Sequence, residues 1–149
     1  MKISFKIDKK INSFLYLDVF EFGKKVEEKK CVGEFFCFSN QRHNGISADV
    51  NLSNVSHKIN YIKESDDDLI GEIELLDTPN GILSKKIIKC NKASIMVAPR
   101  MLICPSLASV DSPAKAILLS VDFCENMKNK RYSLSKKKFY HKTNILKIY

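Results

Sequence analysis

The sequence predicts a single domain of the α+β class that is mostly β, with the strands in a barrel or sandwich and a few short helices. Its 149 residues correspond to one domain. Several short segments alternate apolar and polar residues with a period of two, which is typical of half-buried strands. Turn-forming residues separate these segments, and only one or two stretches have helical spacing.

The N-terminal third of the chain predicts three strands. Residues 2–7 alternate, with Ile3, Phe5 and Ile7 on one side of the strand. Residues 14–22 are expected to form a second strand, and the dense apolar run at 14–17 indicates burial on both faces. Aromatic and β-preferring residues at 31–38 predict a third strand. Residues 23–30 and 39–47 are polar and are expected to be loops.

A β-hairpin is predicted from residues 55–62 and 69–76. Ile70, Ile73 and Leu75 alternate with polar residues along its second strand. The acidic segment 64–68 forms its tip. This segment lacks the Gly and the terminal Glu of an EF-hand loop, so we expect a solvated turn rather than a calcium site.

Turn chemistry at residues 77–81 is followed by a predicted helix. Thr78 fits an N-cap, and Pro79 fits the first helical position. Ile82, Leu83 and Ile87 then lie close to helical spacing. Strands are expected at 94–97 and 116–123.

The five cysteines, which include Cys37, show no C-x-x-C spacing, so a zinc site is not expected. They are interpreted as small buried hydrophobes in a reducing compartment. No apolar stretch approaches the roughly 20 residues that a membrane span needs, and the N-terminus does not resemble a signal peptide. We expect an intracellular protein without a metal or cofactor.

The net charge of +8 lies entirely in the C-terminal segment. Residues 128–149 contain eight Lys or Arg and no acid, whereas residues 1–127 hold 17 basic and 17 acidic residues. We therefore predict a domain at 1–127 and a basic arm at 128–149. Aromatic residues interleave with the cations, which favours contact with an acidic partner over a purely solvated extension. The candidate partner-binding residues are Lys128, Lys130, Arg131, Lys136, Lys137, Lys138 and Lys142.

Three sequence blocks, in order from residue 50 to residue 100, together resemble the phage prohead (head-maturation) protease family with its assemblin-like fold. The first, at 50–59, reads VNLSNVSHKI; the second, at 71–81, reads GEIELLDTPNG; the third, at 95–100, reads IMVAPR. Residues 1–30 and 125–149 have no clear counterpart. The resemblance implies a mostly antiparallel β-barrel with a few short helices.

The resemblance also implies where a catalytic site would lie. These proteases use a serine nucleophile and a histidine base. The family's Ser-Ser-Arg run corresponds to Ala98, Pro99 and Arg100, so both hydroxyls are missing and only the arginine is retained. The base aligns with Cys37, and Asp122 resembles the third group of the triad. His57 resembles a structural histidine of the family.

The resemblance therefore implies a non-enzymatic capsid auxiliary or decoration protein of a bacteriophage, assembled in the host cytoplasm and located in the virion. Its expected partners are the major capsid protein and other head proteins, with nonspecific contact of the basic arm with packaged DNA. Two alternatives remain: an active maturation protease, for example with Ser94 or Ser106 and His43, or an inactive partner in the prohead core or scaffold. A reactive Cys37 is disfavoured by its phenylalanine neighbours.

Overall fold

The computed structural model describes residues 1–13, 15–36, 50–91, 95–103, 114–125 and 147–148. Its helices are α1 (Phe20–Glu27) and α2 (Pro79–Asn91), with a short 3-10 turn at Leu52–Asn54. Its strands are β1 (Lys2–Asp8), β2 (Lys10–Asn12), β3 (Leu15–Asp18), β4 (Val32–Phe36), β5 (Val55–Ser65), β6 (Asp68–Leu75), β7 (Ile95–Ile103), β8 (Ala114–Glu125) and β9 (Lys147–Ile148).

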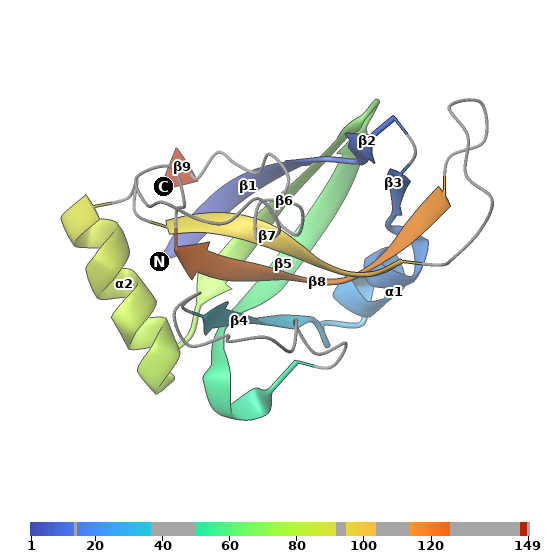
Figure 1. Ribbon diagram of the computed structural model, residues 1–149. Coiled ribbons are helices and arrows are strands. Elements are labelled where there is room, and N and C mark those ends of the chain that lie inside the picture. The colour runs from blue at the N-terminus through green and yellow to red at the C-terminus, as the bar shows by residue number, and fades with distance from the viewer. Residues whose placement is uncertain (14, 37–49, 92–94, 104–113, 126–146, 149) are drawn as a thin grey trace.

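All the described strands belong to one strongly curled sheet, a half-barrel with α2 at one end and α1 at the other (Figure 1). The order is β2-β3-β8-β4-β5-β6-β1-β9, and β7 pairs with the other edge of β8. The prediction of a mostly β domain with few helices is confirmed. The prediction that the sheet is antiparallel is only partly right, because β3 and β4 each pair with β8 in parallel. The two lie one after the other along β8, beside Ala114–Ile117 and Phe123–Cys124 respectively.

The predicted hairpin is confirmed as β5 and β6, which pair from His57 with Leu75 to Ser65 with Asp68. Along β6 every second residue is buried, including Leu69 and Ile73. Asp66 has a φ of 51°, a left-handed conformation that short acidic residues tolerate in turns.

The predicted start of α2 is confirmed as well. The Thr78 hydroxyl accepts a hydrogen bond from the Gly81 N–H at 3.1 Å and donates one to the Val55 carbonyl at 2.5 Å. Pro79 occupies the first helical position, where its missing N–H costs nothing. The helix is longer than predicted and continues to Asn91.

The prediction of a strand at 14–22 is wrong beyond Asp18, and the prediction of a loop at 23–30 is wrong as far as Glu27 but right for residues 28–30. The strand ends at Asp18 and α1 follows, with the Asp18 carboxylate accepting a hydrogen bond from the Phe20 N–H at 3.0 Å. Val19, Phe22 and Val26 are all buried. Their spacing of three and four residues places them on one helical face.

Strand β7 extends well beyond the predicted 94–97 and contains Pro99. Within the described ranges β7 pairs only with β8, so it is an edge strand. A proline is tolerated on such a strand because its missing N–H interrupts no second ladder.

The core lies inside the curl of the sheet. Its largest fully enclosed side chains come from both halves of the sheet and from α1: Phe5, Phe22, Phe123, Ile3, Ile7, Leu17, Leu69, Ile73 and Leu118.

A buried ion triad at the candidate functional site

Arg100 of β7 lies in the centre of three buried charges. Its Nε donates to Asp122 Oδ2 on β8 at 2.9 Å, and its guanidinium also pairs with the Glu34 carboxylate on β4. Asp122 Oδ1 in turn accepts the Glu34 backbone N–H at 3.0 Å. All three side chains are more than nine-tenths buried. The network therefore links three neighbouring strands without contact with solvent.

Two predicted site residues, Ala98 and Asp122, are direct partners across the β7–β8 ladder. Ala98 is 1% exposed and Asp122 is 1% exposed. The structure thus brings together Ala98, Arg100 and Asp122. It also places Pro99 beside Val121 in the same ladder.

Glu34 was not predicted as a site residue. One signal in the sequence points to it, because it is an isolated acid between Gly33 and Phe35 in a segment that otherwise favours a strand. A carboxylate in such a place is buried only when it has a partner. The partner, Arg100, lies 66 residues away along the chain, so its identity depends on the tertiary fold.

The triad carries one positive and two negative groups. Burial raises the pKa of Asp122 to about 6, while Arg100 and the hydrogen bond from the Glu34 N–H act in the opposite direction. Binding a proton at Asp122 would leave one positive and one negative charge, which is the less costly combination in a buried site.

The His57 side chain is fully buried, and each of its two ring nitrogens forms a hydrogen bond. Its Nε2 donates to the Val121 carbonyl at 2.7 Å, so its Nδ1 is the acceptor of the Ser56 hydroxyl at 2.7 Å. Burial lowers the pKa of His57 to about 4, an effect that the bond to Val121 opposes. Ser56 and His57 are a hydroxyl and an imidazole in hydrogen-bond contact, but both are 0% exposed and no substrate atom could reach them. The interpretation of His57 as a structural residue agrees with this arrangement.

The described cysteines do not form a reactive site. Burial raises the pKa of the Cys31 thiol to about 11, which disfavours the nucleophilic thiolate. Cys124 is also buried, whereas Cys90 is exposed on α2, so the prediction of burial is wrong for Cys90. Among the described residues no group of acids, cysteines and histidines could hold a metal ion. No helix in the described ranges is long and apolar enough to cross a membrane.

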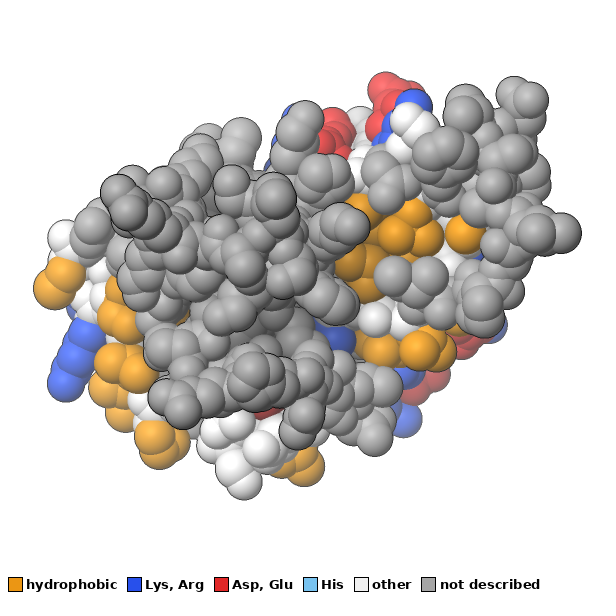
Figure 2. Space-filling model, in the orientation of Figure 1, with side chains coloured by type: hydrophobic (Ala, Val, Ile, Leu, Met, Phe, Trp, Pro, Cys, Tyr) orange, Lys and Arg blue, Asp and Glu red, His pale blue; other side chains and the backbone are white. Residues whose placement is uncertain are grey.

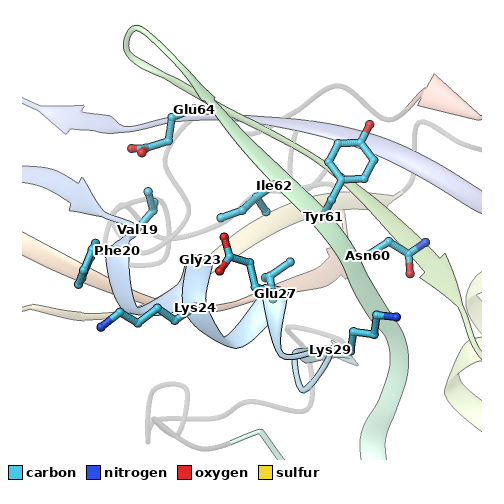
Figure 3. A pocket seen from close by; sticks show the side chains of 11 residues that line it. Val19, Phe20, Gly23, Lys24, Glu27, Lys29, Asn60, Tyr61, Ile62 and Glu64 are labelled. Atoms are coloured by element: carbon cyan, nitrogen blue, oxygen red, sulfur yellow. The ribbon is translucent and has the colours of Figure 1, made fainter.

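A surface groove with a volume of about 520 Å³ lies between α1 and β5 (Figure 3). Phe20 and Tyr61 border it, and Lys24 lies over the Phe20 ring with its Nζ 4.4 Å from the ring centroid. Glu64 at one end is held by Lys9 at 3.1 Å. The lining includes no serine, cysteine or histidine. The groove is therefore a surface feature separate from the triad.

Several predicted residues lie outside the described ranges. These are Cys37, the alternative residues His43, Ser94 and Ser106, and the seven cations of the basic arm. Of the 128–149 segment the structure describes only β9, whose Lys147 and Ile148 pair with Ser4 and Ile3.

No family model and no curated protein matches this chain. Among solved structures, the chain is similar to the capsid assembly protease gp21 of bacteriophage T4, with a TM-score of 0.55 and 14% sequence identity over 81% of this chain and 80% of that one. At this level of identity the likeness concerns the fold, and the chain has a prohead-protease-like fold.

Proposed function

We propose that this chain is a non-enzymatic auxiliary protein of a phage head, which binds the major capsid protein and stabilises the shell. The observation that carries the proposal is the presence of an alanine, Ala98, where a serine nucleophile would be expected. It lies opposite Asp122, at the position where the family resemblance would place the nucleophile, and its side chain is a buried methyl group.

The surroundings of Ala98 support the same conclusion. Acyl transfer by a serine protease requires a nucleophile, a base and donors for the oxyanion. Pro99 has no N–H to donate. Arg100 is engaged by Glu34 and Asp122, so its guanidinium is already committed to two carboxylates. The described imidazole, that of His57, points at Ser56 and Val121 inside the core.

The capsid part of the proposal comes from the fold. The similar T4 protein is a capsid assembly protease, so this fold occurs in a protein of capsid assembly. A chain that keeps such a fold but has a methyl group at the nucleophile position would act by binding other proteins rather than by cleaving them. Its partners would then be the proteins that an active relative would cleave.

The test is the copy number of this chain in purified mature particles, measured by quantitative mass spectrometry against the major capsid protein. A decoration protein is expected in many intact copies and in a fixed ratio to the capsid subunit. Few copies, or fragments alone, would contradict the proposal and favour the maturation protease or the prohead core partner.

A second measurement separates those two outcomes. A fluorophosphonate probe labels activated serines, and we expect no labelling of this chain under conditions where an active serine protease is labelled. Labelling that a mapped serine-to-alanine change abolishes would establish an enzyme.

A further inference from the structure

Helix α2 is apolar on its outer side as well as on its inner side. Ile88 is 2% exposed and faces the core, and Ser84 is also enclosed. On the opposite side Ile82 is 44% exposed and Leu83 is 43% exposed. A surface helix normally has one apolar stripe, which packs on its own domain, and a polar outer face.

The same outer face is basic. Among its 13 residues α2 has three lysines and no acid. Lys85 is engaged by Asp77 at 2.7 Å. Lys86 and Lys89 are exposed and form no ion pair within the part of the chain that the structure describes. Figure 2 shows Lys side chains next to hydrophobic ones over this helix.

The helix is also held rigidly at its N-terminal end. Thr78 caps it, and Asn80 Nδ2 donates to the Asn54 carbonyl at 3.1 Å. A Cβ at Gly81 would lie 2.0 Å from the Leu76 carbonyl oxygen, so the helix start packs directly on the backbone. A preformed helix loses little conformational entropy when it binds, which favours a recognition surface.

We infer that the outer face of α2, defined by Ile82, Leu83, Lys86 and Lys89, docks an acidic amphipathic segment of another protein. Charge complementarity selects an acidic partner, because Lys86 and Lys89, which form no ion pair with the described residues, attract carboxylates. The exposed Ile82 and Leu83 select a segment that also carries apolar side chains. The inference extends the proposed function, because it names the surface through which a head protein would be bound.

A nucleic acid would satisfy the lysines but not the two aliphatic side chains. Phosphate contacts need cations alone, and bases are bound through stacking on aromatic or guanidinium groups. The outer face of α2 has neither group in its described part. A protein segment therefore fits this surface better.

The test measures binding of a synthetic amphipathic peptide, with glutamates along one face and leucines along the other, to the full chain by fluorescence anisotropy. We expect the double variants Lys86→Glu/Lys89→Glu and Ile82→Ser/Leu83→Ser each to weaken binding by about tenfold or more. The matched control is Lys63→Glu/Lys115→Glu, which changes the net charge equally at exposed residues of β5 and β8. It should bind the peptide like the wild type.

Three results would overturn the inference. One is an equal loss of peptide affinity in the control variant, which would show that the effect depends on net charge alone. Another is unchanged binding by the Ile82→Ser/Leu83→Ser variant. The third is a DNA duplex that binds the same face more tightly than the peptide and loses affinity only in the lysine variant. Circular dichroism of each variant verifies that it is folded.

Cosedimentation with purified capsid shells distinguishes this inference from the proposed function. If the wild type and both α2 variants cosediment equally, the chain binds capsids through another surface. The inference about α2 then fails, while the proposed function stands. If the wild type does not cosediment, the proposed function fails, and the peptide experiment still decides on α2.

Discussion

Gly33 in β4 and Gly81 in α2 are required by close backbone approach. A Cβ at Gly33 would lie 2.1 Å from the Val121 carbonyl oxygen and 2.2 Å from His57 Nε2. These are the two atoms of a buried hydrogen bond. The glycine is therefore what allows β4, β8 and the imidazole to meet.

Replacing Gly33 by alanine should destabilise the domain by about 3 kcal/mol, because the methyl group both overpacks the site and breaks the His57–Val121 bond. Urea denaturation measures the change. Gly23→Ala is the matched control, since a Cβ there meets Ile62 at an ordinary 3.8 Å. Because Gly23 lies in the middle of α1, its replacement by alanine should stabilise the domain by about 0.5–1 kcal/mol. Equal effects of the two variants would contradict the packing argument.

His57 and Asp122 titrate in the same pH range with opposite effects on stability. The folded-state pKa of His57 is lowered from 6.5 to about 4, so its contribution is present above pH 6.5 and is lost as the pH falls. The folded-state pKa of Asp122 is raised from 3.8 to about 6, so its contribution is present at low pH and is lost as the pH rises. The two contributions have opposite signs and therefore offset each other.

Single substitutions should reveal this compensation. Between pH 4 and pH 6 the free energy of unfolding of the wild type is expected to vary less with pH than that of either single variant. Asp122→Asn should lose stability as the pH falls, because the histidine effect alone remains. His57→Gln should lose stability as the pH rises, because the aspartate effect alone remains. Denaturant melts across this range measure both slopes, and parallel slopes in all three proteins would refute the assignment.

At the scale of secondary-structure elements, the ion triad of Arg100, Glu34 and Asp122 links β4 to β7 and β8. Its three members are unequal, since Arg100 is the single cation facing two carboxylates. Removing it leaves two buried negative charges, whereas removing Glu34 leaves a balanced pair. Breaking a buried pair costs far more than the pair contributes, because the remaining charge is unsolvated.

Arg100→Met should therefore destabilise the domain by about 3–5 kcal/mol. Glu34→Gln should cost only about 1–2 kcal/mol, because its amide keeps the size and the Asp122–Arg100 pair survives. Urea denaturation at neutral pH compares the two. A similar loss in both variants would show that the charge balance of the triad does not govern its stability.

The elements that the sequence predicted are those whose signals are local. The β5–β6 hairpin shows its period of two and its acidic tip, and α2 shows Thr78 and Pro79 at its start. The α1 helix was missed because its eight residues contain only two buried ones, Phe22 and Val26, too few for a clear period. The parallel pairs of β8 could not be predicted, since they join β3 and β4 to a strand about 90 residues or more later in the chain. A separation of 66 residues likewise hid Glu34 as the partner of Arg100, whereas Ala98 and Asp122 were named as candidates through the family resemblance.

The charges of the whole molecule are divided between the domain and its C-terminal segment. Lysines of the strands are matched by acids on neighbouring strands, as in Lys2 with Glu72, Lys6 with Asp68 and Lys58 with Glu74. Such surface pairs cancel locally and leave little long-range field. The excess of positive charge belongs to residues 128–149, which have eight cations and no acid. Any nonspecific attraction to DNA should therefore come from this segment.

Salt dependence tests this division in the full-length chain. Replacing the seven predicted cations by glutamine (Lys128, Lys130, Arg131, Lys136, Lys137, Lys138 and Lys142) should remove most DNA binding at low salt. If all seven contact phosphates, the wild-type plot of log affinity against log salt has a slope of about −6, and the variant slope approaches zero. Glutamine at Lys2, Lys6 and Lys58 is the control and should leave the slope unchanged, because each of those cations is already paired. A shallow wild-type slope would mean that few of the seven cations contact phosphates, and it would contradict the prediction.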